Sequence, residues 1–189
     1  MNDGDYLQTA QLTPAEVAAL LGATATVLQT EFAAMPEAML RWRPTSDSWS
    51  VLDVVGHLTE AEQRGFAGRV CQIVTESRPR FQGWDPSEVA RIRNDTARGP
   101  QAVLDEFLTL RAASVELVAS LTASDLGRGG DHPDVGFLTV ADLLHEWVQH
   151  DAAHLTQMRD NVQGYVWPHL GNARRFSQPE IEEIIIAAG

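Results

Sequence analysis

Apolar residues recur every three or four positions along four long segments of this chain, and that spacing restricts its fold more than any other feature. The segments span residues 14–35, 51–77, 100–121 and 139–164. An amphipathic helix buries its apolar stripe only when another element covers it. We therefore predict an all-α fold, a four-helix bundle in a single domain that spans residues 1–189.

Three of these helices begin with a capping signal, in which a Ser or Thr is followed three residues later by an acidic side chain. The hydroxyl can accept a hydrogen bond from the third helical N–H while the carboxylate reaches back to the cap. The pairs are Thr13 with Glu16, Ser50 with Asp53, and Thr139 with Asp142.

Three further segments lie outside the long helices. Asp85-Pro86 predicts the start of a short extra helix between the second and third long helices, and Gly99-Pro100 predicts its end. Glycines and a proline within 127–136 predict a break before the last helix. The residues after Gly164 form a C-terminal extension, whose apolar stretch at 181–186 could pack on the bundle or on a second subunit.

The composition excludes several classes of function. The net charge is −12 and no arginine cluster interrupts it, which argues against a nucleic-acid partner. The chain has no lysine for a Schiff base, and its single cysteine excludes both an intrachain disulfide and a multi-cysteine zinc site. No apolar run of 18 residues and no signal-peptide pattern is present, so we expect a cytoplasmic protein.

His150 and His154 lie four residues apart on the apolar stripe of the last helix, so both rings fall on one face of it. One interpretation is a shared metal ion, and the alternative is two neutral rings whose nitrogens are all hydrogen-bonded. Burying two imidazoles side by side without a cation is costly, so their position on the core stripe favours the metal.

His57 lies about two turns into the second helix and His150 about three turns into the last, so antiparallel packing would bring them level. Metal sites in bundles are built from side chains that converge from facing helices. We therefore predict that His57, His150 and His154 bind one divalent transition-metal ion. Three imidazoles suit zinc or nickel, and also iron or copper, and they leave coordination positions for water or substrate.

The remaining histidines and the cysteine fit this site less well. His145 precedes His150 by five residues, so HEWVQH is not the metalloprotease motif, and we expect His145 at the surface. His132 and His169 stand next to prolines in loop or tail segments, where ordinary polar roles are expected. Cys71 is roughly 21 Å along a helix from His57, too far to bind the same ion.

Three carboxylates near the predicted ligands are candidate catalytic groups: Glu60, Glu146 and Asp151. Glu60 and Glu146 each lie about one turn from a ligand and could accept a proton from bound water, although a solvated helix surface is the favoured interpretation for both. Asp151 lies on the apolar stripe and therefore needs a partner, either a ligating imidazole or Arg111.

The stretches WSVLDVVGHLTEAE, HPDVGFLTVADLL and HEWVQHDAAHLTQM, followed by a Trp-Pro near the C-terminus, resemble the DinB/YfiT superfamily of metal-binding four-helix bundles. The resemblance covers most of the chain and rests on the order and separation of these stretches. In that family one histidine of the second helix and an H-x-x-x-H of the last bundle helix bind the metal. These positions correspond here to His57, His150 and His154.

The resemblance also implies an activity. Relatives include transferases that activate the sulfur of a small thiol such as bacillithiol or mycothiol, and this reaction class is our leading hypothesis. Two alternatives stay open: a hydrolase that uses a metal-bound water, and a non-enzymatic, metal-dependent stress or sensor protein. Arg64, Arg69 and Arg111 are candidates to bind the carboxylates of such a thiol.

Several expectations about partners follow. We expect a small-molecule substrate with a low-molecular-weight thiol as cosubstrate, and no nucleic-acid or membrane partner. The apolar tail and the many dimers among similar proteins favour a homodimer.

Overall fold

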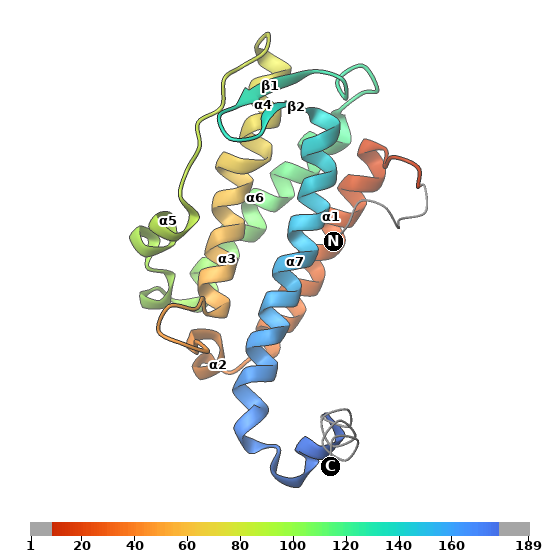
Figure 1. Cartoon of the computed structure of the whole chain (residues 1–189). Coiled ribbons are helices and arrows are strands. Elements are labelled where there is room, and N and C mark those ends of the chain that lie inside the picture. The colour runs from red at the N-terminus through yellow and green to blue at the C-terminus, as the bar shows by residue number, and fades with distance from the viewer. Residues whose placement is uncertain (1–8, 178–189) are drawn as a thin grey trace, which may run out of the picture.

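Four long helical segments pack side by side in the computed structural model, which describes residues 9–177 (Figure 1). One of the four segments is divided into two helices. Each segment contacts two neighbouring segments, so that the four form a closed ring around the core. The predicted all-α four-helix bundle is therefore confirmed. The segments are α1 (Pro14–Ala34), α3 (Val51–Glu60) with α4 (Ala67–Thr75), α6 (Pro100–Ser120) and α7 (Val140–Val166).

All three predicted capping pairs form. At the start of α3, Ser50 N–H donates to Asp53 Oδ2 at 2.9 Å, and Asp53 N–H donates to Ser50 Oγ at 3.2 Å. The equivalent reciprocal contacts begin α1 and α7. Each pair satisfies N–H groups that have no partner inside the helix, so the caps explain why these helices begin where they do.

The second long helix is not continuous, which differs from the single helix predicted for 51–77. A π-helical segment, η1 (Ala61–Gly65), separates α3 from α4. A π segment takes one more residue for its turn than an α-helix does and so rotates everything that follows it. Such segments occur frequently at functional sites, and this one begins four residues after His57.

Shorter elements decorate the bundle. The predicted extra helix is present as α5 (Pro86–Arg93), which lies outside the bundle against α3 (Figure 1). The segment predicted as a simple break contains an antiparallel hairpin instead, and Gly136, which follows the hairpin loop and begins the second strand, has a φ of 80°. The other short elements are α2 (Glu37–Arg41), η2 (Asp95–Ala97), β1 (Gly129–His132), β2 (Gly136–Thr139), η3 (Trp167–His169) and η4 (Gly171–Phe176). The apolar stretch at 181–186 lies outside the described residues, so the homodimer expected from it stays a prediction.

The hairpin is attached to the chain that leads from α4 to α5. Phe81 N–H donates to the Asp131 carbonyl at 2.9 Å, and Asp131 N–H donates to the Pro79 carbonyl at 2.9 Å. Arg78 also pairs with the Asp131 carboxylate through two contacts of 2.9 Å. These bonds fix the hairpin over one end of the bundle (Figure 1).

The apolar core forms two clusters. One, near the hairpin, includes Leu21, Phe66 and Trp147, and the other includes Leu28, Phe107 and Met158. Helix α1 contributes to both, and its length and mean hydropathy of 1.3 over an 18-residue window would also suit a membrane-crossing helix. Its contacts with α6 and α7 account for that composition within the bundle.

Arg111 lies between the two apolar clusters and joins all four long segments. Its side chain is 1% exposed and pairs with Glu62 of η1 and with Asp151 of α7. It also donates to the Leu21 carbonyl of α1 at 3.3 Å. The guanidinium lies 5.0 Å from the centre of the Phe107 ring and 5.8 Å from that of Trp147. A buried cation is stable here because two carboxylates and a carbonyl replace its hydration.

We predict that Arg111→Met lowers the free energy of unfolding by about 3–5 kcal/mol, because it leaves two buried carboxylates without a cation. Urea denaturation at neutral pH measures the change. The matched control is Arg159→Met, which removes a solvent-exposed pair with Glu31 and should cost about 0–1 kcal/mol. Equal, small losses in the two variants would contradict this account of the core.

Candidate metal centre

His57 of α3 and His150 and His154 of α7 meet inside the bundle. The Nε2 atoms of His57 and His150 are 3.0 Å apart, and those of His150 and His154 are 3.2 Å apart. A tetrahedral ion with metal–nitrogen distances of about 2.0–2.1 Å separates its ligands by roughly 3.3–3.4 Å. Two of the three nitrogen pairs are therefore close to this spacing, and the candidate ligand atoms of all three residues lie within 4.8 Å of one another. The structure thus brings together the three residues predicted as ligands.

The ring orientations also suit a metal. Gln157 Oε1 lies 2.8 Å from His154 Nδ1, and since an amide oxygen only accepts, Nδ1 carries the proton and Nε2 presents its lone pair. The Nδ1 atoms of His57 and His150 are buried with no hydrogen-bond partner among the described residues. An ion bound to all three Nε2 atoms would place the proton of every ring on Nδ1, as Gln157 already does for His154.

The environment keeps these rings neutral. Burial lowers the pKa of His57 to about 4, and the neighbouring His154 contributes to the shift. Burial, followed by the charges of His154, His57 and Arg111, lowers the pKa of His150 to about 3. Burial lowers the pKa of His154 too, although Gln157 and Asp151 oppose it. Neutral imidazoles are the form that binds metals, so the site is ready for an ion at pH 7.

Two tryptophans enclose His57. The Trp49 ring centre lies 4.9 Å from that of His57, and Trp84 stacks on the His57 ring at 5.8 Å with an interplanar angle of 26°. His150 has an aromatic neighbour in Phe66, which in turn stacks on Trp147. These rings hold the imidazoles in place and limit the access of water to them.

His57 and His150 form part of the wall of a cavity of about 700 Å³. This metal-site cavity is bounded by η1 and α4, by the segment at residues 83–86, by the hairpin and by the first turns of α7. Its size is typical of sites for small organic molecules. The residues that line it are His57, Ala61, Gly65, Phe66, Arg69, Gly83, Trp84, Pro86, His132, Asp134, Val135, Leu138, Asp142, Leu143, Glu146 and His150.

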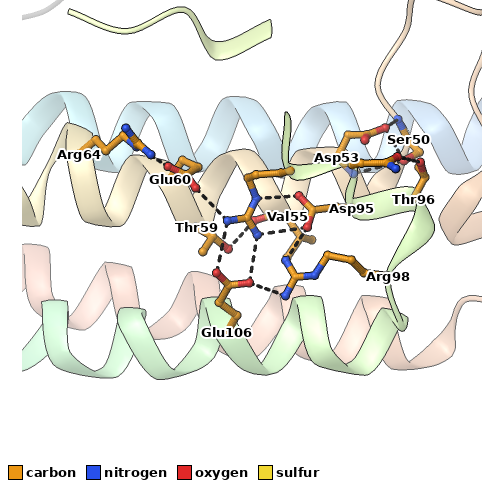
Figure 2. A network of polar contacts seen from close by, with 12 residues as sticks. Ser50, Asp53, Val55, Thr59, Glu60, Arg64, Asp95, Thr96, Arg98 and Glu106 are labelled. Atoms are coloured by element: carbon orange, nitrogen blue, oxygen red, sulfur yellow. Dashed lines mark hydrogen bonds and ion pairs between the residues drawn. The ribbon is translucent and has the colours of Figure 1, made fainter. Parts of the chain in front are cut away.

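Glu60, expected on a solvated surface, is in fact 6% exposed and belongs to an ion-pair network (Figure 2). Its carboxylate accepts from Arg64 Nε at 2.5 Å and from Arg93 Nη1 at 2.9 Å. Burial raises the pKa of Glu60, but the hydrogen bonds from Arg93 and Arg64 outweigh it, and the net pKa is below the ordinary value. Glu60 is thus a poor proton acceptor, because both of its oxygens already hold arginines.

The same network fixes α5 against α3 and contains a buried acid that was not predicted from the sequence. Asp95, 1% exposed, pairs with Arg93 at 2.7 Å and with Arg98 at 2.6 Å (Figure 2). A Cβ on Gly56 would lie 1.9 Å from Asp95 Oδ2, so a larger residue beside His57 would displace Asp95 from its arginines. A glycine inside a helix next to a predicted ligand was the one available signal of this close approach.

The other candidate acids differ in their surroundings. Glu146 is exposed at the rim of the metal-site cavity, as expected for a solvated side chain. Asp151 is paired with Arg111, one of the two partners predicted for it. Arg111 and Arg64 are therefore occupied by carboxylates, whereas Arg69 lines the cavity.

The remaining histidines and Cys71 lie apart from the three ligands. His145 was expected at the surface but is only partly exposed, because its Nε2 accepts a hydrogen bond from the Leu12 N–H at 3.1 Å. His132 lines the cavity and contacts Arg69, and the ordinary polar role expected for it stays a prediction. His169 and Cys71 are exposed, as their predicted exclusion from the site requires.

We predict that metal-free protein loses stability as the pH falls from 6.5 towards 4. In this window the unfolded chain protonates histidines of ordinary pKa near 6.5, while folded His57 and His150, with pKa values of about 4 and 3, stay neutral. The unfolded state then binds more protons, so the free energy of unfolding falls. Urea denaturation of the wild type and of His150→Gln, both treated with chelator, measures the effect.

The difference in stability between the wild type and His150→Gln should change in this pH window, to the disadvantage of the wild type at lower pH. The control is His169→Gln, which replaces an exposed histidine outside the metal site. A difference for His150→Gln that does not change with pH would show that the pKa of His150 is not lowered in the folded protein.

Comparisons with known proteins agree with this architecture. A family model described as the DinB superfamily matches residues 10–158. Among solved structures, YfiT from Bacillus subtilis aligns with a TM-score of 0.73 and 19% identity, over 85% of this chain and 94% of that one. YfiT is described as a probable metal-dependent hydrolase with an unusual four-helix bundle topology, and at this identity the likeness shows the fold alone. None of the curated proteins matches the chain.

Proposed function

Because the chain belongs to the DinB superfamily, we propose that it is a metal-dependent transferase in which an ion on His57, His150 and His154 activates the sulfur of a small thiol. One observation carries this proposal: three neutral imidazoles converge through Nε2 beside a cavity of about 700 Å³. Zinc or nickel suits the donor set best, and iron and copper are the alternatives.

A bound ion would lower the pKa of the thiol, so that the thiolate is the nucleophile at neutral pH. The side chains around the ion have two further roles. The three histidines would hold the ion without adding charge to the site. Trp84 and Phe66 give the cavity an apolar wall that limits the entry of water. The thiolate sulfur would then bond to an electrophilic carbon of a small molecule bound in the same cavity. A leaving group would depart from that carbon with the bonding electron pair, and the proton of the thiol would pass to solvent.

A thiol is favoured over water because of the acids at the site. An ordinary thiol has a pKa of about 8.5 and water one of about 15.7, so a thiol needs less help to ionise. Glu60, a buried carboxylate one turn after His57, is held by Arg64 and Arg93, and Asp151, which directly follows His150, is held by Arg111. Neither carboxylate can readily take a proton. The geometry therefore suits a nucleophile that the metal alone can ionise.

Hydrolysis is the second candidate, and Glu146 supports it. Its carboxylate lines the same cavity, lies four residues before His150, and is exposed enough to exchange protons with solvent. The description of YfiT as a probable metal-dependent hydrolase points the same way. If this candidate is correct, Glu146→Gln abolishes hydrolysis while leaving the metal content unchanged.

We predict that the reconstituted wild type binds about one ion per chain, and that His150→Ala lowers the metal affinity by at least roughly 100-fold. Elemental analysis and competition with a chelating dye measure this. In the cobalt-substituted protein, a small thiol should shift the visible absorption spectrum as sulfur enters the coordination sphere. The control is His169→Ala, an exposed histidine whose loss should change neither result.

A wild type that binds no ion after reconstitution would contradict the whole proposal. One ion with no spectral response to thiols, together with cleavage of model esters, would replace the transferase by the hydrolase. One ion with neither activity would leave a metal-dependent sensor or stress protein, in which the ion stabilises the bundle.

A further inference from the structure

The metal-site cavity has a cationic end as well as a metal end. Arg69 of α4 lines it, and Arg69 Nη2 lies 3.0 Å from Nε2 of His132 in β1. Its guanidinium also stacks over Phe81, 5.5 Å from the ring centre. These contacts hold the side chain in place without neutralising its charge.

Arg69 lacks the partner that a partly buried guanidinium normally has. Its Nε is buried without a hydrogen-bond partner among the described residues, and none of the carboxylates in 9–177 pairs with it. Burial lowers the pKa of Arg69, yet a guanidinium stays protonated at neutral pH. A fixed, charged and incompletely bonded fork is well suited to a carboxylate or a phosphate.

The π segment places Arg69 on the same face as His57. Twelve residues separate the two, and at about 100° per residue a regular α-helix would set them about 120° apart. The extra residue taken up by η1 reduces the interval to an effective eleven, or about 20°. The Cα atoms are then roughly 17 Å apart along the axis, and the Arg69 side chain leans back towards His57.

We infer that Arg69 is the binding site for an anionic group, a carboxylate or phosphate, on an elongated organic molecule whose other end reaches the three histidines. The inference deepens the proposed function and rests on it for the identity of the reactive end. The anion can belong to the thiol or to its electrophilic partner, because both would share this cavity. A small acid that cannot span from α4 to α7 would bind at Arg69 alone, without reaching the histidines.

Acidic residues at the rim do not cancel this charge. Asp142 is committed to the cap of α7, where its carboxylate accepts the Thr139 N–H at 2.9 Å. Asp134 and Glu146 are exposed, so water screens them. The net charge of −12 repels anions from the surface in general. The guanidinium of Arg69 would therefore favour only those anions that fit into the cavity and reach it.

A neighbouring cavity supplies the control. Arg69 also borders a cavity of about 490 Å³ that lies outside the metal site and is lined by Arg80 as well. Arg80 is exposed and does not line the metal-site cavity. Arg80→Gln therefore removes the same charge from the same side of the protein without touching the proposed anchor.

We test the inference with two thiols of equal length, mercaptohexanoate and mercaptohexanol, titrated into the cobalt-substituted protein and followed by absorption. The wild type should bind the carboxylate at least roughly tenfold more tightly than the alcohol. Arg69→Gln should abolish this preference without weakening the alcohol, Arg69→Lys should retain part of it, and Arg80→Gln should keep all of it. Cobalt content and circular dichroism verify that each variant is folded.

Equal affinities for the two thiols in the wild type, or a preference that survives in Arg69→Gln, would overturn the inference.

A separate experiment uses calorimetry with hexanoate and no metal, so that binding at Arg69 is measured without any thiol chemistry. If no thiol perturbs the spectrum but hexanoate binding depends on Arg69, the proposed function fails and the anchor stands. Hexanoate binding unaffected by Arg69→Gln would remove the anchor while leaving the metal site intact. An aromatic carboxylate without a thiol can also be titrated. If Arg69→Gln weakens its binding as much as that of mercaptohexanoate, Arg69 can anchor the electrophile as well as the thiol.

Discussion

The buried ion pairs of Arg111 are the interaction on which the rest of the structure depends. This guanidinium contacts a carboxylate of η1, a carboxylate of α7 and a carbonyl of α1 from its own position on α6. Asp151 directly follows the ligand His150, and Glu62 lies five residues after His57. The pairs therefore fix the relative position of the two helices that carry the histidines. Their geometric requirements are strict, because a buried charge without its partner costs several kcal/mol.

The parts of the fold that local rules determine were predictable from the sequence. Helix starts follow from side chains three residues apart, and all three capping pairs form as expected. The bundle follows from the apolar stripes, and the membership in the DinB superfamily follows from motifs within them. His57, His150 and His154 were found because imidazoles on a buried face need a common partner, and the structure brings them within 4.8 Å of one another.

What the sequence left open depends on contacts between distant segments. The π segment after Glu60 has no recognisable signature in the residues AEQRG, so rules based on local sequence predict a continuous helix there. Glu60 was expected at the surface because its main partner, Arg93 of α5, lies 33 residues later in the sequence and contacts it only in the folded chain. Residues 127–136 were predicted to form a break because glycines at 129, 130 and 136 are compatible with a loop or with a hairpin. The pairing of the two strands and their bonds to residues 79–81 are contacts that form only in the folded chain. The far wall of the cavity, which bears on substrate choice, is built from these same segments.

The central claim is that the three Nε2 atoms share one ion, and X-ray absorption at the metal edge of the reconstituted protein tests it most directly. The account predicts a first shell with three imidazole nitrogens at about 2.0–2.1 Å for zinc, together with the outer-shell scattering of the rings. One or more light-atom positions should remain for exchangeable ligands. A first shell of oxygens alone, or one that contains the sulfur of Cys71, would place the ion elsewhere and return the three histidines to the core.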